Sequence, residues 1–443
     1  MDRPALAVAL LGLLLAPLVG WLVLLGAVWL AAGVVVLFAG FFLLGRPKLA
    51  LYLLVVGALF NPFYVNAGFA KLGAGDLAML IILPVWVARR LFVGGDLRLP
   101  VGWPLLAAYV VVAGVSLLLG ADPAAAQAAY LRELTYVAAL VAGVDLTRDL
   151  SMKWRPPAES LAADVANFPR LFGLMCLCGL VLVIHALATW PGGRMVGMIG
   201  QPNGLAFILA LCLWPTFGLA LRAKPGWKRT ALFGAFGLMV LGVVLTISRS
   251  NYLGMICAAL WSLRHYRRLV VVAVVVVGSI VVVLSLFPEA TGEIAERWQL
   301  QDRSVSQRLL ERDNAVNTVF ERPWLGVGFG QFERAHMDLD VLVQVGRAAH
   351  NQYLSLPAEV GIPGALLLFG FVFMQFRVMW GRASAVLGDT HRWILVALQA
   401  LAVHQSVTLM FRDAWRQPEW AVLYLYCALA AIVAAPRREA PTG

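Results

Sequence analysis

Charge is scarce in this chain of 443 residues, of which only 13% are Asp, Glu, Lys or Arg and 61% are hydrophobic. The mean hydropathy is +0.82. This composition excludes an ordinary soluble domain and is typical of a polytopic membrane protein. The segment from Ala5 to Leu44 has no charge and is too long for one span of about 20 residues. It is also longer than the apolar core of a signal peptide, so we expect no cleavable leader.

Cysteine is also scarce, and no Cys/His cluster has the spacing of a zinc site. The five cysteines lie inside apolar runs, which predicts small buried side chains and no disulfide framework. We therefore expect neither a metal nor a cofactor. The formal net charge of +11 is attributed to loops that face anionic lipid headgroups, so we expect membrane lipids as partners and no nucleic acid.

The apolar runs predict an all-α polytopic integral membrane protein with about 12–14 transmembrane helices and one long periplasmic loop that contains short helices. Fourteen candidate spans follow from the hydropathy pattern. They cover residues 4–20, 22–44, 49–65, 74–91, 103–120, 126–144, 171–190, 203–222, 230–248, 250–263, 269–287, 353–376, 393–411 and 418–435.

An N-terminus in the cytosol places most of the 35 basic residues on the cytosolic side, as the positive-inside rule requires. The long loop is then expected on the outer side of the membrane. The predicted regions are N-terminal helices at 1–145, a cytoplasmic loop at 146–170, central helices at 171–287, a periplasmic loop at 288–352 and C-terminal helices at 353–443.

The long periplasmic loop holds arginine but no lysine. Seven arginines lie between Phe287 and His350. Arginine stays protonated and presents a planar fork that matches phosphate, so this loop favours binding of an oxyanion. A codon bias towards arginine is the alternative explanation, and the alanine-rich composition is consistent with it.

Two shorter outer segments carry one candidate arginine each. Arg194 lies in a turn rich in Gly and Pro before the span at 203–222, where it could bind a ligand or anchor the protein at the headgroups. Asn203 is expected to cap that span. Arg249 lies in a short run of hydrogen-bonding residues, Ser248 to Tyr252, which could be a plain turn or a phosphate or sugar site.

Within the long loop, Arg303, Arg308 and Arg312 have helical spacing, and apolar neighbours predict an amphipathic helix on the membrane. The glycine-rich segment 326–330 either packs its backbone closely or exposes amides to a ligand. His350 closes the loop beside Asn351, and an imidazole there has suitable acid–base properties for accepting a proton from a hydroxyl.

Other polar residues near the spans are expected to be structural. His404 and His185 lie within apolar spans and should be packed or hydrogen-bonded. Arg412, Asp413 and Arg416 form a cluster whose members should pair with one another, and Arg132 should pair with a neighbour.

These motifs, taken in order, resemble the O-antigen ligase and O-antigen polymerase superfamily of bacterial polysaccharide assembly. The resemblance covers about residues 190–370. The most specific block is His350-Asn351-Gln-Tyr-Leu with Glu359-Val-Gly361-Ile-Pro-Gly364.

The resemblance implies a GT-C-like, metal-independent and inverting glycosyltransferase that uses a glycan on undecaprenyl diphosphate. Such an enzyme lies in the bacterial inner membrane with its active site facing the periplasm. Arg194, Arg249, Arg303 and Arg308 would then hold the diphosphate, Asn351 would contact the glycan, and His350 would activate the acceptor hydroxyl. Catalysis would rest on His350 and Arg249.

The compact outer loop favours a polymerase for O-antigen or exopolysaccharide, whose acceptor is a second lipid-linked repeat unit and which could work with a chain-length co-polymerase. A ligase that attaches the glycan to lipid A-core is the alternative. A transporter or lipid flippase is a further alternative, although the sequence shows no clear internal repeat.

Overall fold

The computed structural model of the chain describes residues 43, 46–60, 64–66, 71–93, 97, 99–146, 168–263, 278, 303–335, 350–381 and 392–412. The regular elements among these residues are helices, apart from the short antiparallel strands β1 (Tyr64–Asn66) and β2 (Lys71–Gly73). The helices are α3 (Pro47–Leu59), α4 (Ala74–Val93), α5 (Trp103–Leu119), α6 (Pro123–Leu146), α8 (Phe168–Ala188), η1 (Gly197–Ile199), α9 (Pro202–Arg222), α10 (Trp227–Leu245), α11 (Arg249–Leu263), α14 (Arg303–Glu321), α15 (Phe332–Ala335), α16 (Gln352–Trp380) and α18 (Arg392–Leu409).

Four of the described helices, α8, α9, α10 and α16, are long and apolar enough to cross a membrane. This confirms the predicted class of all-α polytopic membrane protein. Their bounds agree to within a few residues with the spans predicted at 171–190, 203–222, 230–248 and 353–376. The spans predicted at 4–20, 22–44, 269–287 and 418–435 lie outside the described residues, and the predicted domain boundaries stay predictions.

The span predicted at 49–65 is wrong in its second half. Helix α3 ends at Leu59, and the chain has entered strand β1 by Tyr64. Pro62 explains the difference, because the residue before a proline is disfavoured in the helical region. Hydropathy alone does not register this break.

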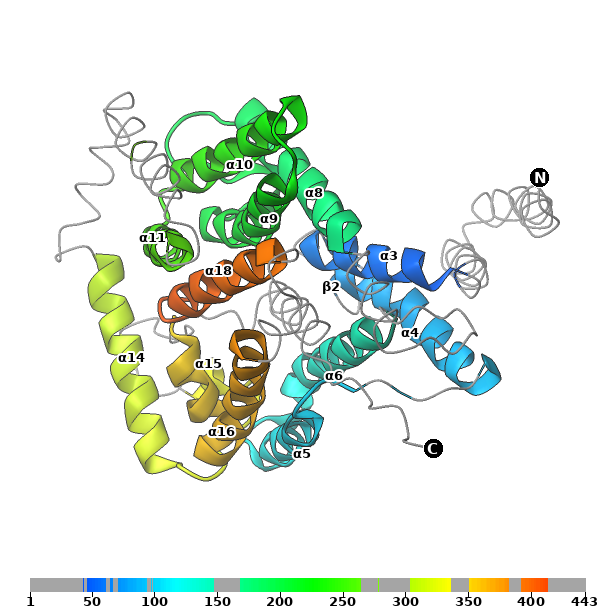
Figure 1. Ribbon diagram of the computed structural model, residues 1–443. Helices are drawn as coiled ribbons and strands as arrows, with labels where there is room; N and C mark the ends of the chain where they lie inside the picture. The colour runs from blue at the N-terminus through cyan, green and yellow to red at the C-terminus, as the bar shows by residue number, and fades with distance from the viewer. Residues whose placement is uncertain are drawn as a thin grey trace, which may run out of the picture.

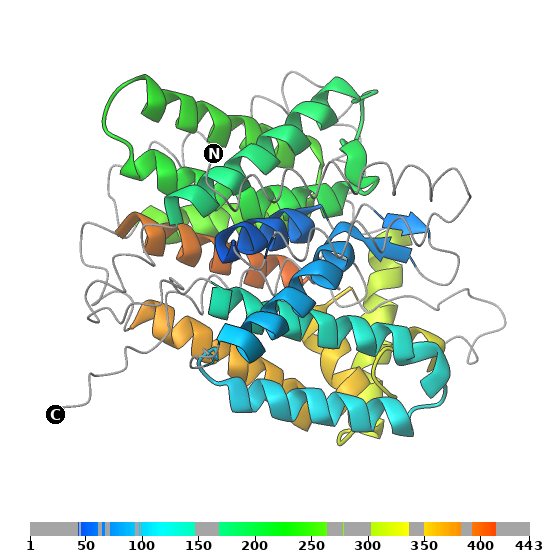
Figure 2. The ribbon, with the colours of Figure 1, turned by 90° about the vertical axis from the view of Figure 1, so that its right-hand side faces the viewer.

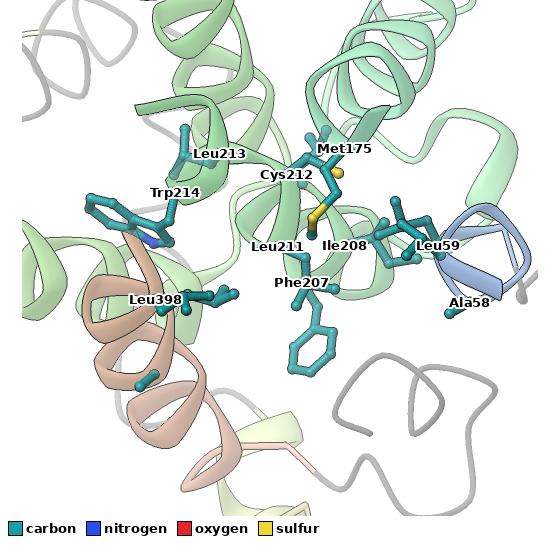
Figure 3. Packing of buried hydrophobic residues seen from close by; sticks show 14 of the residues in the cluster. Ala58, Leu59, Met175, Phe207, Ile208, Leu211, Cys212, Leu213, Trp214 and Leu398 are labelled. Carbon is teal, nitrogen blue, oxygen red and sulfur yellow. The ribbon is translucent and has the colours of Figure 1, made fainter. Parts of the chain in front are cut away.

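Helix α9 forms the centre of the bundle. All its side chains from Gly204 to Ala220 are buried. Figure 3 shows why: Cys212 lies towards Met175 of α8, while Trp214 lies towards Leu398 of α18. A helix that is apolar all round is stable only when other elements surround it. Here α8, α10 and α18 pack around α9.

Most of the helices run side by side, and α14 lies across their direction at one end of the bundle (Figure 2). Helix α18 lies between the group formed by α9 and α11 and the lower group that contains α16 (Figure 1). The α8–α9 connection lies at the same end as α14, whereas the α9–α10 turn lies at the other. That arrangement gathers the connections with the candidate residues at one end.

The glycine-rich segment and the start of α16 form one backbone junction. The N–H of Val327 donates to the carbonyl of Ala358 at 2.9 Å, and the N–H of Gly328 donates to the carbonyl of Glu359 at 3.1 Å. The Glu359 carbonyl is free to accept because Pro363, four residues later, has no N–H. The Glu359 carboxylate accepts a further hydrogen bond from the N–H of Gly330 at 3.0 Å.

Close approach of the two backbones explains two of the glycines. Gly326 and Gly361 both have positive φ, +64° and +74°. A Cβ on Gly361 would overlap the carbonyl of Trp324, and a Cβ on Gly326 would overlap the carbonyl of Ala358. Of the two predicted roles for the segment, these contacts support close packing of the backbone.

Candidate functional site

Arg194 fastens the α8–α9 connection to the ends of two helices. Its Nε donates to the carbonyl of Thr246 at 3.1 Å, and its Nη2 donates to Oδ1 of Asn203 at 3.1 Å. The next residue, Met195, donates its N–H to the carbonyl of Leu245 at 2.9 Å. The guanidinium is thus held between the end of α10 and the start of α9.

The prediction that Asn203 caps α9 is wrong. The N-cap residue is Gln201, which makes no side-chain cap, and Pro202 occupies the first turn. Proline suits this position because its φ is already helical and it has no N–H to satisfy. The Asn203 oxygen is therefore available to orient Arg194.

Arg249 is the first residue of α11 and follows a strained turn. Ile247 in this turn has φ +52°, which is unfavourable for a β-branched residue. Such strain persists only where the surrounding structure imposes it, and it is concentrated at functional sites. Arg249 is half-buried, and the free N–H groups of the first turn add positive potential beside it.

A buried polar chain supports this turn from inside the bundle. The indole N–H of Trp214 donates to Nδ1 of His404 at 3.1 Å, and Nε2 of His404 lies 3.2 Å from Oδ1 of Asn251. Asn251 in turn donates to Oγ of Ser248 at 2.9 Å. Because Nδ1 accepts, Nε2 must carry the proton, so His404 is a neutral donor to Asn251. The structure confirms that His404 is a hydrogen-bonded residue within the bundle.

His350 lies at the start of α16 in a left-handed backbone conformation, with φ +48°. Asn351 caps this helix, since its Oδ1 accepts the N–H of Tyr353 at 3.0 Å. The N–H of Gln352 donates to the carbonyl of Arg412 at 3.2 Å. These bonds fix the backbone on the C-terminal side of His350.

The imidazole of His350 has a carboxylate beside it. Its Nε2 lies 3.7 Å from Oε2 of Glu311 on α14. The Glu311 side chain is 2% exposed, whereas that of His350 is 36% exposed. Glu311 is not among the candidate residues predicted from the sequence. Its position on the helical face of Ala315 and Thr318, which are both buried, is the signal that could have identified it.

Arg303 and Arg308 lie in the first two turns of α14, which confirms the helix predicted from their spacing. Their side-chain positions lie outside what the structure describes. Arg312, one turn further, donates to the carbonyl of Met410 at 3.4 Å and lies over the ring of Phe411. Helix α14 is thereby attached to the end of α18.

Arg412 contacts both the helix that carries Asn203, the partner of Arg194, and the segment that carries His350. Its side chain is buried, and its Cζ lies 5.2 Å from the ring centroid of Phe207. Phe207 is one turn beyond Asn203 on α9, while the Arg412 carbonyl accepts from Gln352 beside His350. Asp413 and Arg416, its predicted partners, lie outside the described residues. Arg194 and His350 are therefore on elements joined by a short series of contacts.

The other end of α9 has a different character. A surface cavity of 600 Å³ lies at the α9–α10 turn, lined by Arg222, Lys224, Lys228 and Trp227 among others. Basic residues with an exposed tryptophan are typical of the membrane interface. This is the end that the positive-inside rule assigns to the cytosol.

The long apolar helices first define a multi-pass membrane protein. Residues 234–369 then match the family model described as O-Antigen ligase. The match supports the predicted resemblance to the O-antigen ligase and polymerase superfamily, whose members are glycosyltransferase-like enzymes. The matched range includes Arg249, Arg303, Arg308, His350 and Asn351. No match to a curated protein was found.

Proposed function

We propose that this protein is an inner-membrane glycosyltransferase that transfers a glycan from undecaprenyl diphosphate to a sugar hydroxyl at the periplasmic face. One observation carries the proposal. Arg194, Arg249 and His350 come from three separate segments, and each borders a helix end with contacts to α9, α11 or α18. Guanidinium groups and an imidazole at the same end of the bundle are suited to a diphosphate leaving group and a hydroxyl nucleophile.

In this mechanism the acceptor oxygen attacks the anomeric carbon while the bond from that carbon to the diphosphate oxygen breaks. The leaving diphosphate keeps the electron pair, and the arginines stabilise its growing charge, usually the largest contribution to such a rate enhancement. His350 accepts the hydroxyl proton, for an additional factor of roughly 10²–10⁴. A single displacement inverts the anomeric configuration, and the arginines fill the role that a divalent cation has in other enzymes.

We further propose that the acceptor is a second lipid-linked repeat unit, which makes the protein a polymerase. The short length of sequence between α14 and α16 supports this choice. The test is reconstitution of the purified protein with a lipid-linked oligosaccharide as donor and either the same molecule or lipid A-core as acceptor. A ladder of products that are multiples of the repeat is the expected result.

A ligase is the second candidate, and the description of the matching family model favours it. In the same assay a ligase yields one product on lipid A-core and no ladder from the lipid-linked unit alone. Failure of both reactions with protein that is folded in detergent would contradict the glycosyltransferase proposal.

A further inference from the structure

Glu311 is unusual for its surroundings. It lies on the face of α14 that packs towards α16, one turn before Ala315, and Ala315 contacts the cluster formed by Val327, Phe332 and Ala358. A carboxylate in such a position loses its hydration, which costs several kcal/mol unless a positive or hydrogen-bonding partner compensates. Leucine would suit the packing better, so the presence of Glu311 requires another explanation.

His350 is the partner that the contacts identify. The 3.7 Å between its Nε2 and Oε2 of Glu311 is longer than a hydrogen bond, but catalytic hydrogen bonds are often long before the substrate binds. The positive φ of His350 and the cap at Asn351 limit how far the imidazole can move. A small rotation of either side chain would close the gap.

We propose that Glu311 is a positioning residue for His350, an inference that rests on the proposed function. Its carboxylate accepts from Nε2–H, which fixes the tautomer and leaves the lone pair on Nδ1. The acceptor hydroxyl gives its proton to Nδ1 as its oxygen bonds to the anomeric carbon and the diphosphate departs with the electron pair. Glu311 stays ionised throughout and stabilises the imidazolium that forms.

Among the described residues, two arginines lie on the elements that carry this pair or contact them. Arg312 lies next to Glu311 on α14, and Arg412 follows the end of α18, where its carbonyl contacts Gln352. Both arginines are present in the wild type and in every variant below. A change produced by substituting Glu311 therefore reports on its own carboxylate.

The experiment compares Glu311→Gln with Glu321→Gln, an exposed site on the same helix, in the full-length protein with lipid-linked oligosaccharide as substrate. Glu311→Gln should lower kcat about 10- to 100-fold and leave KM for the donor unchanged. The acidic limb of its pH–rate profile should move to lower pH, because the carboxylate no longer favours the protonated imidazole. Glu321→Gln should match the wild type in all three quantities.

A double variant separates positioning from simple stabilisation. In the His350→Ala background, Glu311→Gln should cause no further loss of kcat, since both residues act through the same proton transfer. An additive loss would overturn the proposal, as would wild-type kcat and an unmoved acidic limb in Glu311→Gln alone.

Two results distinguish this inference from the proposed function. If His350→Ala is inactive and Glu311→Gln behaves as wild type, only the role of Glu311 fails. If His350→Ala retains full activity, the assignment of His350 as the base in the proposed function is wrong, and the role of Glu311 fails with it. If Glu311→Gln does not fold, Glu311→Asp provides the test instead. Glu311→Asp should lower kcat but leave the acidic limb of the pH–rate profile where it is in the wild type. A displaced acidic limb in Glu311→Asp would overturn the proposal.

Discussion

His350 combines a strained backbone with a partly exposed imidazole, and the accessible ring suits the proposed role of a general base. Its φ of +48° lies in a region that histidine adopts more often than most residues but still at a cost. Neighbouring bonds maintain this conformation, and the ring remains accessible to a substrate.

We expect His350→Ala to remove about 10²–10⁴ of the rate of glycan transfer and to leave insertion and folding intact, because the ring makes few packing contacts at 36% exposure. The measurement is product formation on a gel after reconstitution, alongside thermal unfolding of the same samples. Product at the wild-type level would refute the assignment of His350 as the base.

Arg249 provides a test of the shape of the cation rather than of its charge. Arg249→Lys keeps the positive charge but loses the planar fork, and we expect kcat/KM to fall about 10- to 100-fold, which corresponds to one charge-assisted hydrogen bond of about 1.5–3 kcal/mol. Arg229→Lys, at the opposite end of the bundle near the α9–α10 turn, is the matched control. Equal activity in both variants would make Arg249 a surface anchor.

At the scale of elements, the junction between the glycine-rich segment and α16 explains the conspicuous motif of the outer loop. The sequence allows its amides to be exposed to a ligand, but several of them donate to α16: those of Val327, Gly328 and Gly330. Its role is to hold α14 and the connection that follows it against α16, and hence to fix the direction in which α14 approaches His350.

Gly361→Ala should be among the most destabilising single substitutions in this region. With φ +74° and ψ +171°, the backbone conformation is one that essentially only glycine adopts, and it costs about 1–3 kcal/mol for a residue with a Cβ. The overlap with the Trp324 carbonyl adds to this cost because a backbone carbonyl cannot rotate away. The measurement is the midpoint of thermal unfolding in detergent. Gly173→Ala in α8, whose added Cβ would meet nothing within 4 Å, should be neutral or stabilising.

The turn before α11 depends on the buried chain of Trp214, His404 and Asn251. Asn251→Leu leaves the His404 N–H without its acceptor, and we expect a loss of about 1–2 kcal/mol in the free energy of unfolding. Because the turn positions Arg249, KM for the donor should rise more than kcat falls. An unchanged KM in a destabilised protein would assign the chain a structural role only.

At the scale of the whole molecule, the arrangement of helices separates two chemically different ends. One end has α14, the α8–α9 connection and the start of α16, and the other has the basic α9–α10 turn (Figure 2). An enzyme that draws its driving force from a lipid-diphosphate donor needs no ion gradient. We expect glycan transfer in proteoliposomes to be unaffected by a protonophore, whereas a loss of activity would favour the transporter alternative.

The sequence by itself determined the class of protein and most helix positions, because the exclusion of charge from a bilayer is a property of each segment in isolation. Its local motifs also carry the resemblance to a family whose model matches residues 234–369, and its residue types made His350 and Arg249 candidates for the site. The end of a helix such as α3 depends on a single proline. An average of hydropathy over a whole span does not register one residue of this kind.

Only the tertiary structure decided which residues become partners. Glu311 and His350 are 39 positions apart, and Trp214 and His404 are 190 positions apart. No periodicity relates such pairs, because their contact depends on how α14 crosses the bundle and how α18 packs against α9. The same reason explains why Asn203 binds Arg194 instead of capping its helix: the nearby guanidinium is brought there by a turn whose shape arises from packing.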